Sequence, residues 1–301
     1  MLKSEIKLLF LNMLRRSRIA PTPSGYLHIG NALNFVLTWL WVRKEGGRLR
    51  LRIDDSDTTR SKPEYIEDIF RTLDWLKLDW DEGPQSPDEQ EHVYSQALRA
   101  GRYEEVMRRL MATKLVFACE CSRKDLPERN CNCRMKALSF NQYDTSLRIV
   151  TPLESIPVKD MVGGTQQVDL NNEMKNFVIR RRDGITAYQL CSVTDDIDHD
   201  INLVIRGNDL LSSTAAQQYL ASLIGAGSFA ATTFCHHPLM YDEYGNKLSK
   251  SAASLSLKTM RGQGMGVEQF YIRLSGLMGF AEPCISLQQM LSYEGSLFNM
   301  K

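Results

Sequence analysis

Two short segments, far apart in the sequence, carry residue types suited to binding phosphate. The first, residues 18–31, reads RIAPTPSGYLHIGN. Its prolines stiffen a turn, while Gly25 and Gly30 remove side chains where the backbone would approach a ligand. The second segment, KLSKS, places Lys247 and Lys250 in a polar loop led by a glycine. We therefore predict that the two segments bind one phosphate-containing ligand.

An apolar stripe after the first segment predicts that its turn opens a helix. The stripe recurs at helical spacing and consists of Leu33, Val36, Leu37, Leu40 and Trp41. The N-terminal amides and dipole of such a helix favour phosphate. His28 lies at this N-terminus, where its imidazole can donate to a phosphate oxygen. The alternatives are a buried core histidine and, for the two lysines, ordinary solvated charge.

The elements around the first segment follow a strand–helix–strand–helix order. A short strand at residues 18–20 feeds the turn, and the alternating residues 48–53 form a second strand that runs into Asp54. The sequence SKPE at residues 61–64 predicts a capping box that opens the next helix. This order predicts an α/β fold, a doubly wound sheet of Rossmann type.

The middle of the chain has a different character, with clustered cysteines and few helical periods. Strands resume near residues 177–180 and 202–206, and about fifty residues follow the lysine loop, enough for two or three short helices. The expected organisation is a peripheral N-terminal segment, the first half of a catalytic domain, an insertion, the second half of that domain, and a lysine loop with C-terminal helices. The boundaries are 1–17, 18–115, 116–176, 177–235 and 236–301.

Four of the seven cysteines form two C-x-C pairs within fifteen residues, Cys119 with Cys121 and Cys131 with Cys133. Four thiolates can close a tetrahedral zinc site of the structural kind, which would fold a loop too short for its own core. The alternatives are an iron–sulfur cluster, a catalytic thiol or four unrelated thiols. The other three cysteines are scattered, and we expect them to be buried.

The composition excludes some classes of protein and leaves others open. The 301 residues carry a formal net charge of +1, so no global positive field points to nucleic acid. An RNA partner would have to bind to local cations such as the arginines at 180–182. No apolar run approaches membrane-spanning length. We expect a cytoplasmic protein without a membrane partner, and in that compartment seven cysteines indicate a metal site or burial, not disulfides.

Six segments, in this order, resemble the glutamyl-tRNA synthetases, a class I aminoacyl-tRNA synthetase family, and more narrowly its short glutamyl-queuosine tRNA(Asp) members. They are RIAPTPSGYLHIG, LRIDDSD, the cysteine pairs, RRRDGITAYQL, VIRGNDLL and KLSKS. The resemblance runs from about residue 18 to 257. It implies a Rossmann domain split by an insertion that binds the acceptor end of tRNA. The chain ends where an anticodon-binding domain would begin, so we expect that domain to be absent.

The resemblance also implies a reaction. Glutamate and ATP, with Mg²⁺, would form glutamyl-adenylate, and the glutamyl group would pass to the queuosine base at the wobble position of tRNA(Asp). The partners are then ATP, L-glutamate and the anticodon loop of this tRNA, and we expect a monomer. The alternatives are a truncated glutamyl- or glutaminyl-tRNA synthetase that charges the tRNA 3′ end, a small-molecule nucleotidyltransferase, and a non-catalytic RNA-binding relic.

Site residues follow from the same resemblance. Catalytic roles fall on His28, Lys247 and Lys250. Glutamate would bind to Arg18, Ala20, Thr22, Asp54, Tyr188 and Arg206. ATP would bind to Gly25, His28, Gly30, Asn31 and Lys250. Structural Zn²⁺ would bind to Cys119, Cys121, Cys131 and Cys133.

Three positions depart from the family pattern. Asp54 stands where the glutamyl enzymes typically carry glutamate and the glutaminyl enzymes carry aspartate, so the pattern leaves the choice of amino acid open. Asn31 replaces the last histidine of the nucleotide-binding signature. Cys131 offers a fourth sulfur where queuosine enzymes often use a tyrosine, so the expected metal set is all cysteine.

Overall fold

The first strand–turn–helix unit leads from β1 (Arg16–Ile19) into α2 (Ile29–Lys44) in the computed structural model, which describes residues 14–121, 131–239 and 256–295. Strand β2 (Arg48–Leu51) then pairs in parallel with β1, as the strand–helix–strand pattern predicts. The turn before β2 needs glycine twice. Gly46 has φ +62°, and a Cβ at Gly47 would lie 2.4 Å from the carbonyl oxygen of Arg15.

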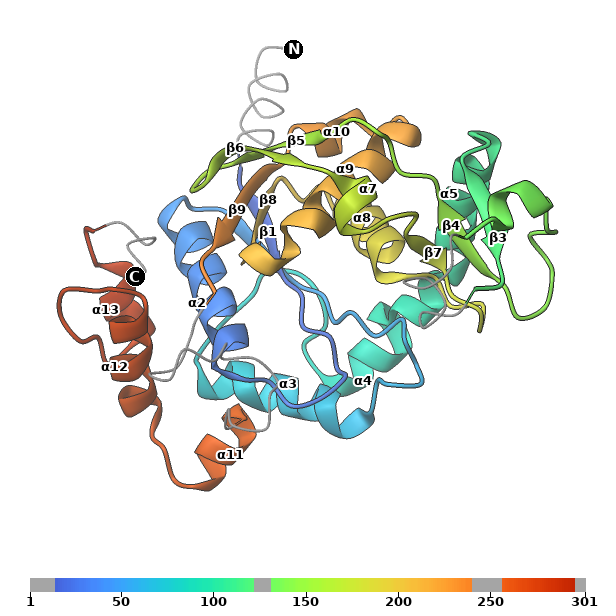
Figure 1. Ribbon diagram of the computed structural model, residues 1–301. Coiled ribbons are helices and arrows are strands. Elements are labelled where there is room, and N and C mark those ends of the chain that lie inside the picture. The colour runs from blue at the N-terminus through green and yellow to red at the C-terminus, as the bar shows by residue number, and fades with distance from the viewer. Residues whose placement is uncertain (1–13, 122–130, 240–255, 296–301) are drawn as a thin grey trace, which may run out of the picture.

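Parallel strands continue beyond β1 and form the central sheet (Figure 1). They are β8 (Leu203–Gly207), β9 (Thr233–His237) and β5 (Ile156–Asp160). Strand β8 lies beside β1, because Asn202 N donates to Arg16 O at 3.0 Å and Ser17 Oγ donates to Leu203 O at 2.8 Å. On the far edge, β6 (Gly164–Val168) pairs antiparallel with β5. Two hydrogen-bonded ladders, β2–β1 and β8–β9–β5–β6, thus lie side by side and give the order β2–β1–β8–β9–β5–β6.

Helices cover both faces of this sheet, so its inner strands are apolar on both sides. Successive residues of β8 show this: Ile205 joins one buried cluster with Leu33 of α2, and Val204 joins another with Leu220. The helices of the second cluster are α5 (Ala100–Ala112), α8 (Tyr188–Asp198) and α9 (Leu211–Leu223). This is the expected doubly wound α/β arrangement.

A second, antiparallel sheet stands apart on the right of Figure 1 and carries the cysteine cluster. Its strands are β3 (Val116–Cys119), β4 (Ser146–Ile149) and β7 (Val178–Arg180), and the short helix η3 (Cys133–Lys136) begins at the last cysteine of the second pair. Strand pairing here crosses the expected boundaries. Strand β7, expected with the catalytic sheet, joins β4, whereas β5 and β6, from within 116–176, join the catalytic sheet. The boundaries themselves stay a prediction.

Three short helices lie within the described residues 256–295, a number that the sequence allows. They are α11 (Leu257–Gly262), α12 (Val267–Leu277) and α13 (Leu287–Leu291). Residues Phe270 and Leu274 of α12 complete the buried cluster around α2. None of the helices in the described ranges has the length and apolarity needed to cross a membrane.

One local prediction is wrong. Helix α3 (Pro63–Trp75) begins at the expected proline, but its N-cap is Lys62, which makes no side-chain capping bond. Proline occupies the first helical position, so the cap falls on the residue before it and Ser61 lies outside the expected box.

The remaining helices of the described ranges are α4 (Pro87–Glu89), η1 (Gln90–Tyr94), η2 (Gln96–Arg99), α7 (Leu170–Glu173), η4 (Asn208–Leu210) and α10 (Gly227–Ala230).

Candidate active site

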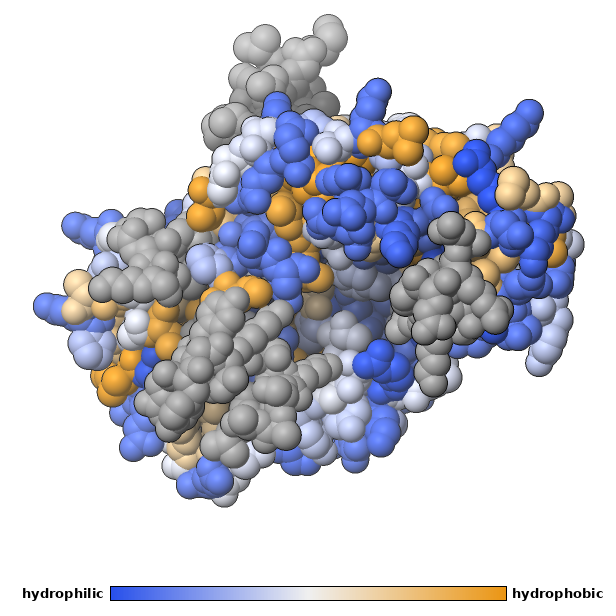
Figure 2. Space-filling view, in the orientation of Figure 1, coloured by the Kyte–Doolittle hydropathy of each residue, from blue (hydrophilic) through white to orange (hydrophobic). Residues whose placement is uncertain are grey.

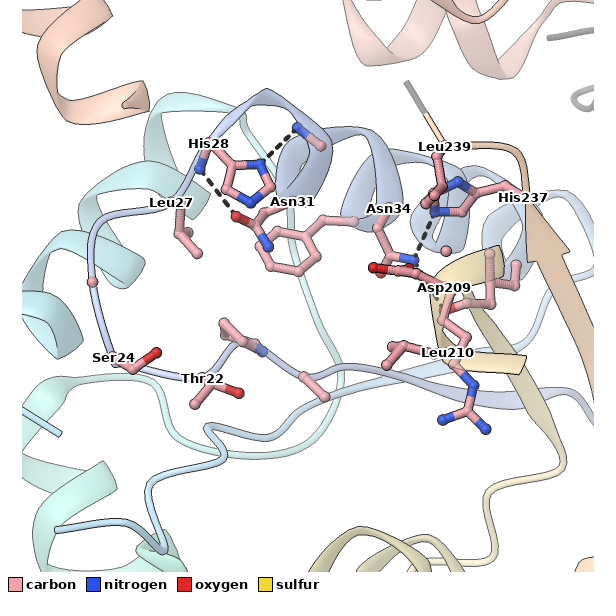
Figure 3. Close-up of a pocket in the computed structure, with 18 of the residues that line it drawn as sticks. Thr22, Ser24, Leu27, His28, Asn31, Asn34, Asp209, Leu210, His237 and Leu239 are labelled. Carbon is pink, nitrogen blue, oxygen red and sulfur yellow. Dashed lines mark hydrogen bonds between the residues drawn. The ribbon is translucent and has the colours of Figure 1, made fainter. Parts of the chain in front are cut away.

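A cavity of about 480 Å³ opens where the carboxyl ends of β1 and β8 meet the N-terminus of α2. Figure 2 shows the face that it belongs to, hollowed near its centre. In Figure 3, Thr22 and Ser24 lie across the cavity from His28 and Asn31, and Asp209 and His237 close the other side. Nine of the predicted site residues line it: Arg18, Ala20, Thr22, Gly25, His28, Gly30, Asn31, Tyr188 and Arg206.

His28 is the N-cap of α2, and this role fixes its tautomer. Its Nδ1 accepts from Gly30 N at 3.1 Å, while the side chain of Asn31 accepts from His28 N at 3.0 Å. These two bonds form a reciprocal capping box, so Asn31 has a structural reason for its place in the motif. Because Nδ1 is an acceptor, the proton of a neutral imidazole is on Nε2, which makes it a donor at the helix N-terminus.

Beneath the cavity lies a buried cluster of two arginines and two aspartates. Asp196 Oδ1 accepts from Arg18 Nε at 3.1 Å and from Arg52 Nη1 at 2.7 Å. Arg52 also pairs with Asp54, with Nε–Oδ1 at 2.6 Å and Nη2–Oδ2 at 3.2 Å. The four formal charges cancel. Arg18 is therefore already paired through its Nε, a partner that the sequence motif does not reveal.

Arg206 differs from Arg18, because it is 3% exposed and forms no ion pair within the described residues. Its Nη2 donates to Thr214 and Gln217, whereas its Nε and Nη1 have no hydrogen-bond partner in that part of the chain. Burial lowers the pKa of Arg206 to about 10, which leaves it charged at neutral pH. A buried guanidinium that forms no ion pair in the described residues, although the charge of Asp196 acts on it, is suited to bind an anion at the cavity wall.

Asp54 does not line this cavity but an adjacent one of about 990 Å³. Thr22, Ser24 and Tyr188 line both, so the two cavities meet there. Burial raises the pKa of Asp54 to about 6, although the contact with Arg52 opposes that shift. A role for Asp54 at the substrate amino group stays a prediction.

Lys247 and Lys250 lie outside the described residues, but both ends of their segment adjoin the cavity. On the near side, Leu239 follows β9 and lines the cavity. On the far side, Ser256 forms an antiparallel bridge with His28, and Leu257 N donates to Leu27 O at 2.8 Å. The roles of the two lysines stay a prediction.

The four clustered cysteines converge from β3 and η3. Cys119 Sγ lies 3.7 Å from Cys131 Sγ, Cys121 Sγ lies 3.6 Å from Cys133 Sγ, and all four sulfurs lie within 4.8 Å of one another. Bonds of about 2.3 Å in a tetrahedral zinc site separate sulfurs by about 3.8 Å. The donor set therefore fits a four-sulfur metal ion. The other three cysteines, Cys191, Cys235 and Cys284, are buried as expected.

The arginines at 180–182 are less available than their sequence suggests. Arg181 pairs with Asp57 and Asp183, and Arg182 pairs with Asp144. Arg180 Nη2 donates to a backbone carbonyl, and burial lowers its pKa. The local cations proposed for RNA thus have partners of their own within the protein.

Some site residues were not predicted from the sequence. Asp196 and Asp195, buried in α8, organise Arg18, Arg52 and Arg99. Asn34 donates to Ile205 O at 3.1 Å and lies 3.3 Å from His237 Nε2 at the cavity wall. Paired acidic residues within an apolar helix, as in CSVTDDID, are the signal that could have identified the first two.

Comparisons with known proteins agree with this geometry. The family model of tRNA synthetases class I (E and Q), catalytic domain, matches residues 15–297. A Glutamyl-Q tRNA(Asp) synthetase of Nitratidesulfovibrio vulgaris is 36% identical over 83% of this chain and 82% of that protein. Glutamate--tRNA ligase 1 of Acidithiobacillus ferrooxidans is 33% identical, over 89% of this chain but only 58% of that protein.

The fold of a solved structure agrees with this assignment as well. A crystal structure of glutamate-tRNA synthetase from Elizabethkingia anophelis superposes with a TM-score of 0.77 at 24% identity, over 95% of this chain and 66% of that one. Together with the match of the family model to nearly the whole chain, this confirms the class I synthetase fold. The chain belongs to the class I tRNA synthetases of the E and Q group, and it is a ligase of that family.

Proposed function

We propose that the protein activates glutamate with ATP and transfers it to the queuosine base at the wobble position of tRNA(Asp). The observation that carries the first half is Arg206, an uncompensated buried cation in the same cavity as the N-terminus of α2. A substrate with an anionic side chain supplies the negatively charged partner that Arg206 lacks among the described residues. The helix N-terminus supplies hydrogen-bond donors for phosphate.

In the first step, a carboxylate oxygen of glutamate attacks the α-phosphorus of ATP. A new P–O bond forms and the bond to pyrophosphate breaks, so no protein nucleophile is required. Arg18, Tyr188 and Arg206 hold the amino acid, while Gly25 and Gly30 allow the phosphates to approach the backbone. Catalysis comes from alignment and from stabilising charge on the leaving phosphates, by His28 Nε2–H, the lysine loop and the Mg²⁺ that accompanies ATP.

In the second step, a hydroxyl of the RNA attacks the mixed anhydride and releases AMP. The larger cavity adjoins the first at Thr22, Ser24 and Tyr188 and reaches the cysteine cluster at Cys121, so it offers room for a nucleoside beside the adenylate. The choice of queuosine is supported by the likeness to a protein named Glutamyl-Q tRNA(Asp) synthetase over 82% of its length.

A second acceptor is the tRNA 3′ end, as in a truncated glutamyl- or glutaminyl-tRNA synthetase. Asp54 favours a glutaminyl enzyme, because glutaminyl enzymes carry aspartate at this position, and the similarity to a glutamate--tRNA ligase favours a glutamyl enzyme. One experiment separates the two. We expect labelled glutamate to attach, with ATP, to tRNA that contains queuosine and not to queuosine-free tRNA. Cleavage of the labelled tRNA into anticodon and 3′-terminal fragments then shows which of the two carries the label.

The outcomes are distinct. Label on the anticodon fragment supports the queuosine base as acceptor. Equal label on queuosine-free tRNA, lost on removal of the 3′-terminal nucleotide, contradicts it and favours the 3′ end. If pyrophosphate exchange occurs but no RNA is labelled, the activation step is supported and both proposed acceptors are refuted.

We also propose that the cysteine cluster binds a structural zinc ion. Purified protein is expected to contain about one zinc per chain by elemental analysis, since a closed four-sulfur set retains its metal. The double substitution Cys119→Ser and Cys121→Ser is expected to lose it. Cys284→Ser is a matched control, because Cys284 is buried far from the cluster in sequence and joins another apolar core. Finding iron, or no metal, in the unaltered protein contradicts zinc.

A further inference from the structure

Arg206 contacts a row of buried polar side chains that do not themselves line the cavity. Arg206 Nη2 donates to Thr214 Oγ1 at 2.6 Å and to Gln217 Oε1 at 3.0 Å. Thr214 Oγ1 lies 2.6 Å from His236 Nε2, and His236 Nδ1 lies 2.6 Å from Asp160 Oδ2. The row therefore runs without a break from the guanidinium to a buried carboxylate.

The chemistry of these groups fixes where the protons are. Burial alone raises the pKa of Asp160, but hydrogen bonds from Gly163 N and the His236 ring outweigh it and lower that pKa, so the group is a carboxylate. Burial, with the charge of Arg206, lowers the pKa of His236 to about 4, so the ring is neutral at pH 7. Its one proton is then on Nδ1, facing a group that only accepts, and Nε2 accepts from the Thr214 hydroxyl at 2.6 Å, a contact shorter than the 3.2 Å between that hydroxyl and Leu210 O.

We propose that Thr214, His236 and Asp160 are positioning residues that aim the guanidinium of Arg206 at the side-chain carboxylate of the substrate. Because the Thr214 hydroxyl donates to His236, its lone pairs face Arg206. Both hydrogens of Nη2 then have acceptors within the protein, and the donors without a hydrogen-bond partner in the described residues are those on Nε and Nη1, which are buried at the cavity wall. The inference rests on the proposed activation of glutamate.

The row also explains how Arg206 is held without being neutralised. A carboxylate in direct contact with the guanidinium would compete with the substrate for its charge. Here the nearest link in the row is a neutral hydroxyl, and Asp160 is separated from Arg206 by two side chains. The ring of Phe234, with its centroid 5.7 Å from Arg206 Cζ, adds an apolar wall that limits movement of the guanidinium.

The test compares Thr214→Val, which keeps the shape and removes the hydroxyl, with Thr214→Ser, which keeps the hydroxyl. In glutamate-dependent ATP–pyrophosphate exchange, Thr214→Val is expected to raise KM for glutamate about 10-fold, the effect of one lost hydrogen bond to a charged group. KM for ATP is expected to change little, whereas the thermal midpoint is expected to fall by a few degrees, because the substitution leaves buried polar atoms of His236 and Arg206 without this partner. Thr214→Ser is expected to stay within about threefold of the unaltered enzyme, a difference below 1 kcal/mol.

Equal rises in both KM values, or no rise at all for Thr214→Val, would overturn the positioning role. A second readout needs no substrate: histidine ¹⁵N–¹H correlation spectra, with His236 assigned by its absence in His236→Asn. The expected result is the Nδ1–H tautomer at pH 7, and the Nε2–H tautomer overturns the row. If the unaltered enzyme shows no glutamate-dependent exchange, the proposed function and the choice of substrate fail together, while the spectrum still decides the row.

Discussion

Lys250→Ala is expected to lower glutamate-dependent ATP–pyrophosphate exchange by about 10²-fold or more, the size of effect seen when a key charge stabiliser is lost. The physical reason is the position of Lys250 in the sequence. Lys250 precedes Ser256, which bridges to His28, by six residues, and six residues span at most about 20 Å. A chain of that length allows its ammonium group to reach the cavity, where we propose that it neutralises the leaving pyrophosphate. The measurement is kcat at saturating ATP and glutamate.

The matched control is Lys159→Ala, which removes an exposed lysine from β5 outside the cavity. It is expected to leave the exchange rate unchanged. An unchanged rate in Lys250→Ala as well would remove Lys250 from the site. A rise in KM for ATP with unchanged kcat would assign the lysine to binding ATP in its ground state instead of to stabilising the transition state.

Arg206→Gln is expected to raise KM for glutamate by about 10²-fold, because truncating one partner of a buried charge pair typically costs 2–5 kcal/mol. Arg206 is the one cavity arginine in the described chain whose charge no carboxylate pairs with, so its removal deprives the substrate of its main anion partner. The thermal midpoint is expected to hold or to rise, since the folded protein no longer buries an uncompensated cation. KM is measured in the exchange assay and the midpoint by calorimetry.

Arg50→Gln serves as control, because Arg50 on the neighbouring strand β2 pairs with Glu82 at 2.7 Å and does not line the cavity. Its KM for glutamate is expected to match that of the unaltered enzyme. If Arg206→Gln instead lowers the midpoint and leaves KM unchanged, Arg206 serves the fold and not the substrate.

Much of the fold could be predicted from local sequence patterns. Strand β1, helix α2 and strand β2 follow from alternation, helical periodicity and a glycine turn, all of which act over a few residues. The pairing of β5 with β9 could not be predicted, because register between strands more than seventy residues apart depends on the packing of the whole sheet. The capping box at 61–64 failed because proline at 63 shifted the cap.

The candidate site, too, was only partly predictable from the sequence. Motifs identified His28, Arg18 and Arg206, which do line one cavity, but they could not show which arginine is already paired. That difference depends on Asp196, which is 178 residues from Arg18 in sequence. Likewise, Asn31 reads as a departure from a motif, and only the structure reveals its bond to the backbone of His28. Partners in space decide the electrostatics, and a linear pattern does not contain them.

The central claim, that this cavity activates glutamate, is tested most directly by ATP–pyrophosphate exchange in the unaltered enzyme with glutamate, glutamine and aspartate in turn. Glutamine has the shape of glutamate without the charge, and aspartate has the charge on a shorter side chain. The expected result is exchange with glutamate and at least about 10²-fold lower kcat/KM with glutamine, because a neutral amide leaves Arg206 uncompensated. Exchange that is equal with glutamine, or absent with glutamate, would contradict the account.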